Sequence, residues 1–186
     1  MSRIFQLIKR GLTFSLLVSS TSYAAPVDSE TEWNTWPAVG EAQLSVFIFD
    51  VYQSRLQTPN GTYSVDADIT PHPLALSIDY QRDISQQQLL DATEDQWEEM
   101  GFDKQLSQRW IQELVTIFPN IEKGQNLTYV TDGQSGHFYF RSNEMASPTR
   151  IGSITDESLN DAFLAIWLSP KTTYPKLRAQ LIGLSQ

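Results

Sequence analysis

The chain has 186 residues, enough for one ordinary domain with a real hydrophobic core, and it carries 22 acidic against 13 basic residues. Its formal net charge of −9 opposes binding to nucleic acid or to anionic membrane surfaces, because phosphate groups would be repelled. The lack of cysteine excludes disulfides and thiolate chemistry. The 2 histidines are far apart in the sequence and have no metal-ligand spacing, so we expect no metal and no other cofactor.

Residues 1–24 have the pattern of a secretory signal peptide. Three basic residues precede a short apolar run at 11–18, and Ser22 and Ala24 are the small residues expected before a cleavage site. The apolar run is too short to span a bilayer. Cleavage after Ala24 would remove those three basic residues and leave a mature domain, 25–186, whose formal net charge changes from −9 to −12. We therefore expect an exported protein with no membrane span after cleavage.

The most apolar run of the mature chain is 43–52, and a single carboxylate, Asp50, interrupts it. Its β-branched and aromatic residues fit a buried, pleated surface, and it has no helical stripe. We interpret it as the central strand of a sheet, covered on both faces. A second strand is expected at 54–58, followed by a tight turn at Gly61 and a returning strand at 62–65.

The next segment contains one strand and two helices. Residues 74–81 alternate between apolar and polar types, which predicts a half-buried strand. Ser85 with Gln88 forms a capping box that opens a helix, and Gly101 ends it. Asp103 is placed to cap the following helix.

The last third of the chain begins with strands and ends with helices. A glycine-rich loop joins two strand candidates at 125–131 and 137–141 as a hairpin, and 145–154 adds a third strand. Thr155 is expected to cap a helix, and a shorter last helix is expected at 174–184. The order of elements predicts an α+β fold in which helices gather on one side of an antiparallel sheet.

Several short motifs occur in a characteristic order. The predicted central strand ends in Val51-Tyr52, the segment 79–84 joins a strand to a helix through an aromatic-Arg-Asp-Ile pattern, and the two closing helices at 154–184 are separated by a Trp-Leu-Ser-Pro break. Residues 117–119 and Gly124 add to the pattern. Over nearly all of the mature chain, this layout resembles the chalcone isomerase superfamily, and more closely its exported bacterial chalcone isomerase-like branch. The resemblance implies an open-faced β-sandwich, with a large antiparallel sheet covered by a layer of helices and a cleft between them.

The resemblance bears on activity through two positions. In true chalcone isomerases a threonine on the central strand helps to hold the substrate, and an arginine before it polarises the reacting group. A gap-free alignment from Val51-Tyr52 places Phe47 at the threonine and a residue near Thr35 at the arginine, and no Arg or Lys occurs from 25 to 54. A phenyl ring cannot donate a hydrogen bond to a developing oxyanion. The departures imply a non-catalytic member.

The superfamily also contains non-catalytic members that bind fatty acids in the cleft. We therefore expect a periplasmic monomer that binds a small apolar or amphipathic ligand, such as a fatty acid, between sheet and helices. Arg82 would anchor a carboxylate, with Tyr80 as hydroxyl donor. The more common role for such an arginine is a local ion pair with Asp79 or Asp83. Tyr52 either points its hydroxyl into the cleft or belongs to the core.

Three further residues complete the candidate ligand site. Phe47 would form part of an apolar wall. Asp50 is either a buried acid with a raised pKa or, more commonly, a strand-end residue bonded to backbone amides or paired with Arg55. Trp97 could line the cleft together with other aromatic residues at helical spacing, although such a stripe more often belongs to the core.

Two other classes of function stay open. One is an intramolecular lyase or isomerase of the chalcone isomerase type that uses Tyr52, Tyr80 or Arg82 in place of the missing groups. The other is a ligand-free interaction module of the cell envelope, whose cleft is filled by side chains such as Phe47 and Phe49.

Overall fold

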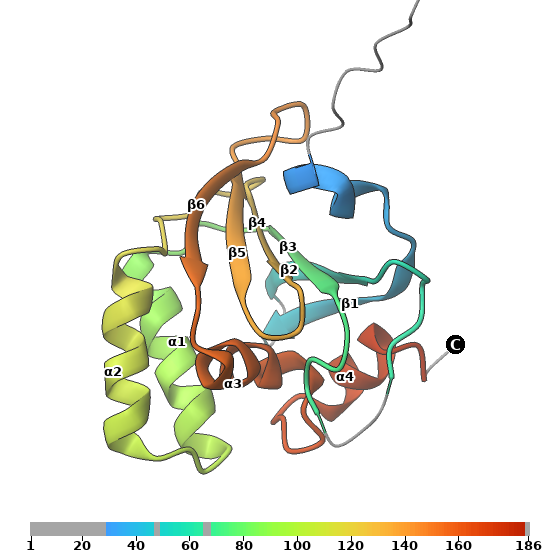
Figure 1. Ribbon diagram of the computed structural model, residues 1–186. Helices are drawn as coiled ribbons and strands as arrows, with labels where there is room; N and C mark the ends of the chain where they lie inside the picture. The colour runs from blue at the N-terminus through green and yellow to red at the C-terminus, as the bar shows by residue number, and fades with distance from the viewer. Residues whose placement is uncertain (1–28, 47–48, 65–67, 185–186) are drawn as a thin grey trace, which may run out of the picture.

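The computed structural model describes residues 29–46, 49–64 and 68–184, so the expected signal peptide and Phe47 lie outside the described residues. The described chain forms an antiparallel sheet of 6 strands in sequential order, with α-helices on one face (Figure 1). The strands are β1 (Ala38–Val46), β2 (Phe49–Gln57), β3 (Leu74–Tyr80), β4 (Asn126–Thr131), β5 (Gly136–Arg141) and β6 (Thr149–Ile154). The helices are η1 (Ser29–Thr35, a 3-10 helix), α1 (Gln86–Glu99), α2 (Lys104–Val115), α3 (Glu157–Leu168) and α4 (Pro175–Leu181). The predicted α+β class is confirmed.

The predicted starts of the first two α-helices are confirmed by their caps. The Ser85 hydroxyl accepts a hydrogen bond from the backbone of Gln88, whose side chain accepts one from the backbone of Ser85, so the capping box is complete. Asp103 caps α2 by accepting from the backbone of Leu106. The third start was predicted one residue too early, because Asp156 and not Thr155 caps α3.

The interpretation of 43–52 as one central strand is wrong. β1 ends at Val46, β2 begins at Phe49, and these two residues pair in an antiparallel register, so the run contains a chain reversal. β1 is an edge strand, and the side chains of Val46 and Phe49 are 45% and 58% exposed. The run is apolar without being buried, so composition alone did not separate a continuous strand from a hairpin.

The returning strand expected at 62–65 is also absent from its described part, because β2 pairs directly with β3. The turn at Gly61 is confirmed by its φ of +71° and by a hydrogen bond from its N–H to the carbonyl of Thr58. Side-chain bonds hold the chain beyond the turn as a loop, including one from the Tyr63 hydroxyl to the carbonyl of Ile69.

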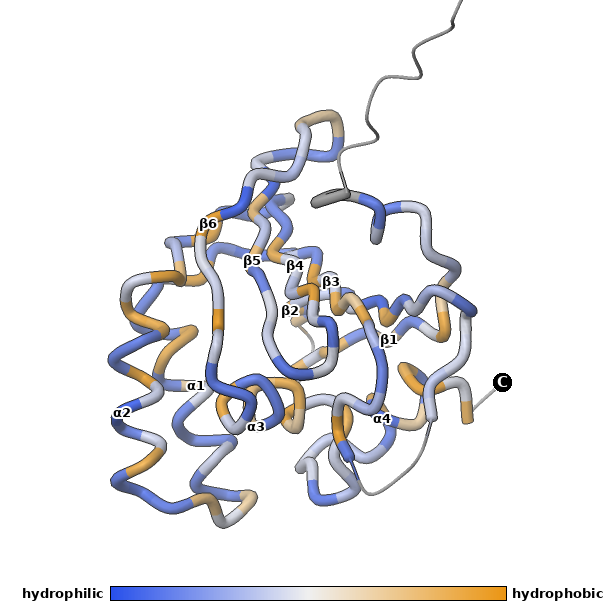
Figure 2. Tube along the Cα trace, in the orientation of Figure 1, coloured by the Kyte–Doolittle hydropathy of each residue, from blue (hydrophilic) through white to orange (hydrophobic). Residues whose placement is uncertain are grey.

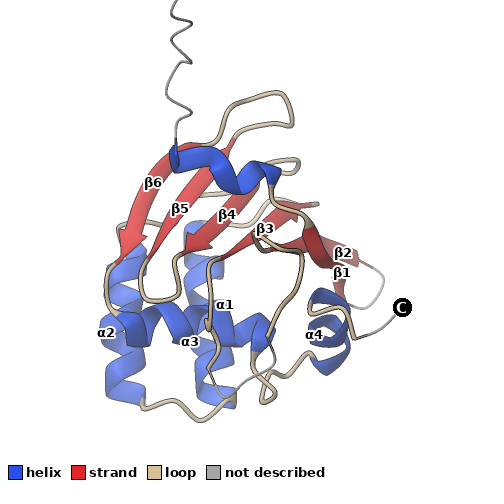
Figure 3. Ribbon diagram, turned by 45° about the vertical axis from the view of Figure 1, so that its right-hand side comes forward, coloured by secondary structure: helices blue, strands red, loops and turns tan. Residues whose placement is uncertain are grey.

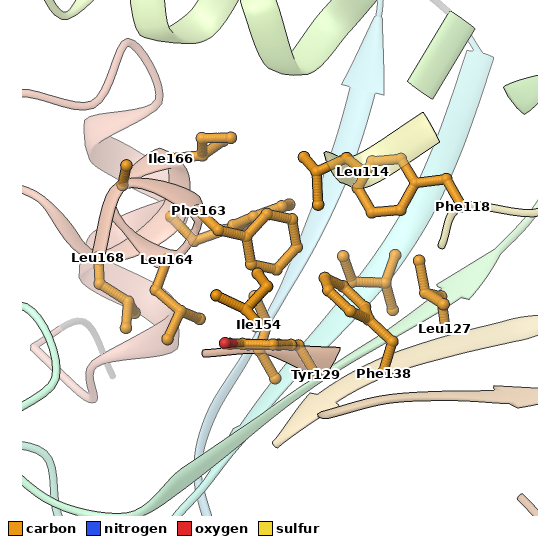
Figure 4. Close-up of a cluster of buried hydrophobic side chains, with 14 of the residues drawn as sticks. Leu114, Phe118, Leu127, Tyr129, Phe138, Ile154, Phe163, Leu164, Ile166 and Leu168 are labelled. Carbon is orange, nitrogen blue, oxygen red and sulfur yellow. The ribbon is translucent and has the colours of Figure 1, made fainter. Parts of the chain in front are cut away.

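The core lies between the sheet and α3, which is apolar along most of its length (Figure 2). Figure 4 shows Phe163 of α3 pointing toward Tyr129 and Phe138 of the sheet, and its ring centroid lies 5.1 Å from each of theirs. Burial of each such side chain contributes about 1.5–3 kcal/mol. None of the helices in the described ranges is both long enough and apolar enough to cross a membrane.

No α-helix of the described ranges lies on the other face of the sheet, and we call it the open face. η1 lies across part of it, as Figure 3 shows with η1 and the α-helices on opposite sides of the strands. Trp33 of η1 packs there with Ala75 and Tyr139. Because η1 covers this part of the open face, Ala75 is fully buried and β3 is not the half-exposed strand that its alternation predicted.

Candidate ligand-binding groove

The central part of the candidate site lies where β3 ends. The register of β2 and β3 places Tyr52 opposite Tyr80, with ring centroids 6.1 Å apart. Immediately after β3, the N–H of Gln81 donates to the carbonyl of Val51 at 2.9 Å, so the departing chain stays close to β2. The pairing brings two tyrosines from segments 28 residues apart in the chain together at one end of the sheet.

Backbone hydrogen bonds fix the junction between β3 and α1. Asp83 accepts from the backbone N–H of Lys123 at 2.8 Å, and Ile84 and Ile121 exchange two backbone hydrogen bonds of 2.9 Å. Arg82 therefore lies between two residues that are held in place, Gln81 and Asp83. The first turns of α1 lie beside the ends of β2 and β3.

A groove of about 290 Å³ opens between these elements, and we call it the amphipathic groove. The buried side chains of Tyr52 and Tyr80 form part of its wall, and the exposed Arg82 is one of its polar lining residues. Its apolar lining comes from β1, β2, the junction and α1, through Leu44, Val51, Ile84, Leu89 and Ala92. The groove thus combines an apolar surface with a cation and two tyrosine side chains.

Both tyrosines are neutral hydrogen-bonding groups at physiological pH. Burial raises the pKa of Tyr52, and a hydrogen bond of 2.9 Å that its hydroxyl accepts from the indole N–H of Trp167 opposes that shift only in part. Burial also raises the pKa of Tyr80, and the neighbouring Tyr52 raises it further. The Tyr80 hydroxyl makes no hydrogen bond to another described residue, so its donor is available to a ligand.

Arg82 does not form the local ion pair that we considered the more common role. Asp79 instead bonds Arg141 at 3.2 Å, and Asp83 is occupied by the backbone of Lys123. The Arg82 guanidinium lies 5.7 Å from the ring centroid of Phe49, a cation–π contact, and has no carboxylate partner within the described ranges. The structure therefore leaves Arg82 able to pair with an external anion.

Two other predicted site residues lie away from the groove. Asp50 is exposed in the β1–β2 hairpin and accepts a 2.6 Å hydrogen bond from Ser45, so it is neither a buried acid nor the partner of Arg55, which pairs with Glu41 at 2.7 Å. Trp97 does not line the groove. It is fully buried and donates to the carbonyl of Ala162 at 2.7 Å, so the interpretation of Trp97 as a core residue is correct.

Three residues outside the predicted set of ligand-binding residues shape the groove. Phe49 supplies the aromatic ring in cation–π contact with Arg82, and the indole N–H of Trp167 donates a hydrogen bond to the hydroxyl of Tyr52. Leu44 reaches the groove because it pairs with Tyr52 across the β1–β2 register. Recognition of a hairpin inside 43–52 would have placed Leu44 beside Tyr52. No comparable local signal connects Trp167 with Tyr52, because 115 residues separate them.

The chemistry of the groove suits binding of an amphipathic molecule. Arg82 offers a planar set of N–H donors for a carboxylate, Tyr80 offers a neutral hydroxyl, and the aliphatic lining offers surface for a hydrocarbon. Among the described residues, no group of three or more His, Asp or Glu side chains has the arrangement of a metal site.

Fold and groove together define an α+β protein with an amphipathic site at the junction of sheet and helices. The chain belongs to the chalcone isomerase-like family, whose model matches residues 40–183, from β1 to the end of α4. It is also similar to an uncharacterized protein of Haemophilus influenzae, with 28% identity over 148 residues, which cover 80% of this chain and 68% of that protein. The match to the family model begins after η1.

Proposed function

We propose that this protein is an exported, non-catalytic member of the family that binds a small amphipathic carboxylate, such as a fatty acid, in the amphipathic groove. The observation that carries the proposal is the guanidinium of Arg82, which lies at an apolar groove and has no carboxylate partner among the described residues. A cation beside an aliphatic wall matches a charged head joined to a hydrocarbon tail.

Two groups would contact the head of the ligand. Arg82 would form a charge-assisted pair with the carboxylate, and the Tyr80 hydroxyl would donate a second hydrogen bond. Tyr52 would act indirectly, because its hydroxyl already accepts from Trp167 and its ring packs against that of Tyr80.

The size of the groove predicts a dependence on chain length. Its volume of about 290 Å³ is near the lower end of the range of about 300–1,000 Å³ for small-molecule pockets. Each buried methylene contributes about 0.8 kcal/mol, or roughly fourfold in affinity. Affinity should therefore rise along a series of saturated fatty acids and level off once the groove is filled.

Calorimetric titration of the mature protein with fatty acids from hexanoate to hexadecanoate, each paired with the alcohol of equal length, tests the proposal. We expect the acids to bind more tightly than the alcohols, because only a carboxylate pairs with Arg82. Arg82→Ala should weaken binding of the acids by about 10-fold or more and leave binding of the alcohols nearly unchanged. Arg109→Ala, a matched change at an exposed site on α2, should alter neither.

Two results of the titration would overturn the binding proposal. The first is that no acid binds saturably, which would favour a ligand-free interaction module of the envelope. The second is that Arg82→Ala and Arg109→Ala bind every acid equally well. The export proposal has its own test, because the protein purified from the periplasmic fraction should begin at Ala25. Retention of Met1 on cytoplasmic protein would contradict it.

An isomerase remains the second candidate, because the Tyr80 hydroxyl and Arg82 together could stabilise an oxyanion. The non-catalytic proposal predicts that cyclisation of a chalcone, followed by absorbance, proceeds at the uncatalysed rate. A faster rate that Tyr80→Phe abolishes would show that the protein is an enzyme. The proposal draws support from the segment near Thr35 that aligns with the catalytic arginine, because Thr35 ends η1, which lies on the open face and contributes no residue to the groove.

A further inference from the structure

The open face of the sheet carries a second depression, of about 600 Å³, that we call the polar groove. It runs beside η1 and is lined by side chains from four neighbouring strands, β2 to β5. Gln53 and Arg55 of β2, Asp79 of β3, Asn126 of β4 and Arg141 of β5 all contribute to it. The alternation of the strands places these polar residues on the face opposite the aromatic core.

Hydrogen bonds between the lining residues hold the base of the polar groove in place. One oxygen of Asp79 accepts from the amide of Asn126 at 2.8 Å and from the guanidinium of Arg141 at 3.2 Å. Arg55 is paired with Glu41 at 2.7 Å, and the amide of Gln53 also reaches Glu41, at 3.3 Å. The side chains are therefore arranged before any ligand arrives, and that lowers the entropic cost of binding.

These pairs also determine the charge that the polar groove presents. Arg55 and Arg141 are each paired with a carboxylate, and Lys123 and Glu144 add one charge of each sign, so the lining offers both donors and acceptors and charges of both signs. A polyanion would gain little from paired guanidinium groups in a chain of formal net charge −9. A hydrocarbon would leave the amides and the carboxylate without partners. A neutral ligand rich in hydroxyl groups fits best, because each hydroxyl both donates and accepts.

Trp33 adds a largely buried aromatic residue to the lining. Its side chain is 6% exposed, and its indole N–H is buried without a hydrogen-bond partner within the described residues. A buried N–H without a partner is uncommon in folded proteins. Planar amide, carboxylate and guanidinium groups beside an aromatic edge suit a sugar, since its vicinal hydroxyls can bridge the planar groups.

We propose that the polar groove is a second binding site and that it takes a short neutral oligosaccharide. This site lies on the opposite side of the sheet from the amphipathic groove and goes beyond the function proposed above. Trp33, which lines the polar groove, belongs to a segment outside the 40–183 range matched by the family model. The two grooves share no charged residue, and Tyr80 is the one residue that lines both, so fatty acid and oligosaccharide should bind without displacing each other.

The test is titration of the mature protein with three neutral hexasaccharides of different linkage and substitution: maltohexaose, cellohexaose and N-acetylchitohexaose. Binding is followed by calorimetry and by the ¹H–¹⁵N resonance of the Trp33 indole, which Trp33→Phe identifies. We expect at least one sugar to bind saturably and to shift that resonance. The double variant Gln53→Ala/Arg55→Ala should lower the affinity at least tenfold, because both side chains line the groove from exposed positions.

The double variant Gln105→Ala/Arg109→Ala is the matched control, because it removes the same two residue types from exposed positions on α2. It should bind the sugar as the unaltered protein does, and decanoate should not compete. Three results would overturn the proposal: no saturable binding of any of the three sugars up to about 10 mM, equal affinity in both double variants, or displacement of the sugar by decanoate. The first two results would not bear on Arg82 and the fatty-acid proposal, whereas displacement by decanoate would also place the fatty acid at or beside the polar groove.

Discussion

Neighbouring residues of β5 lie in two different environments. Phe138 faces the α-helices, is fully buried, and contacts the rings of Phe118, Tyr129 and Phe163. Tyr139 faces the other way and packs with Trp33 beneath η1. One side of the sheet is a dry aromatic core, whereas the other is polar and closed only in part. The helix-covered side should therefore provide most of the stability, and polar residues of the open face are available for binding.

The largest expected difference between the two sides comes from alanine at these neighbouring positions. Phe138→Ala should lower the free energy of unfolding by about 3–5 kcal/mol, because it leaves a cavity among three aromatic rings. Tyr139→Ala should cost about 2 kcal/mol, since its main aromatic neighbour is Trp33. Urea unfolding of both variants measures the difference, and equal losses would contradict the asymmetry of the two faces.

A smaller effect is expected where the core meets the amphipathic groove. Tyr52→Phe removes the acceptor of the Trp167 indole and leaves a buried N–H unpaired, which should cost about 1–3 kcal/mol. Tyr80→Phe is the matched change, and it should be nearly neutral for stability because that hydroxyl has no partner among the described residues. Tyr80→Phe should still weaken fatty-acid binding. Thermal unfolding with and without decanoate separates the two effects, and a large loss of stability in Tyr80→Phe would refute this assignment of roles.

On the open face, an isosteric change should cost less than in the core. The Thr128 hydroxyl bonds Ser77 at 2.8 Å and the side chain of Asn126 at 2.8 Å. Thr128→Val breaks both bonds, but water can enter the polar groove and replace them, so we expect a loss of about 1 kcal/mol. A loss above about 2 kcal/mol in urea unfolding would mean that this network is as dry as the core.

The parts of the fold that sequence predicted depend on local interactions. Ser85 and Asp103 cap helices with hydrogen bonds that span three residues, and the β4–β5 hairpin has a glycine-rich loop, so each signal lies within one short segment. The chain reversal between Val46 and Phe49 carries no Gly, Pro or Asn signal, because Phe and Ile occupy 47–48. An apolar run was therefore interpreted as a buried strand, and the register that follows from the hairpin was lost.

Sequence predicted only those residues of the candidate site that lie within one short sequence motif. Tyr80 and Arg82 lie in the strand-to-helix junction, and the structure brings them together with Tyr52 in one groove. Trp97 was a poor candidate, because spacing on a helix does not tell which side of the helix faces the sheet and which lines a groove. The polar groove was not predicted, since its residues come from four strands and η1 and meet only when the register is known.

The smallest expected effect concerns a carboxylate on the helix-covered side. Asp161 of α3 accepts hydrogen bonds from the hydroxyl of Thr70 and from the side chain of Asn160. Partial burial raises its pKa, Asp68 raises it further, and the two hydrogen bonds oppose the shift. Because the folded protein binds this proton more tightly than the unfolded chain does, the contribution of Asp161 to stability is greatest at low pH and decreases as the pH rises through the raised pKa.

Asp161→Asn should therefore be slightly more stable than the unaltered protein at pH 7, by less than about 1 kcal/mol because solvent screens this partly exposed group. The advantage should vanish near about pH 3, where the carboxyl is protonated in both states. Asp132 provides the opposite case, since backbone N–H groups of Ser135 and Gln134 lower its pKa. Asp132→Asn should lose stability at pH 7 and recover it as the pH falls. Urea unfolding across this range checks both signs, and a parallel response of the two variants would show that burial does not control Asp161.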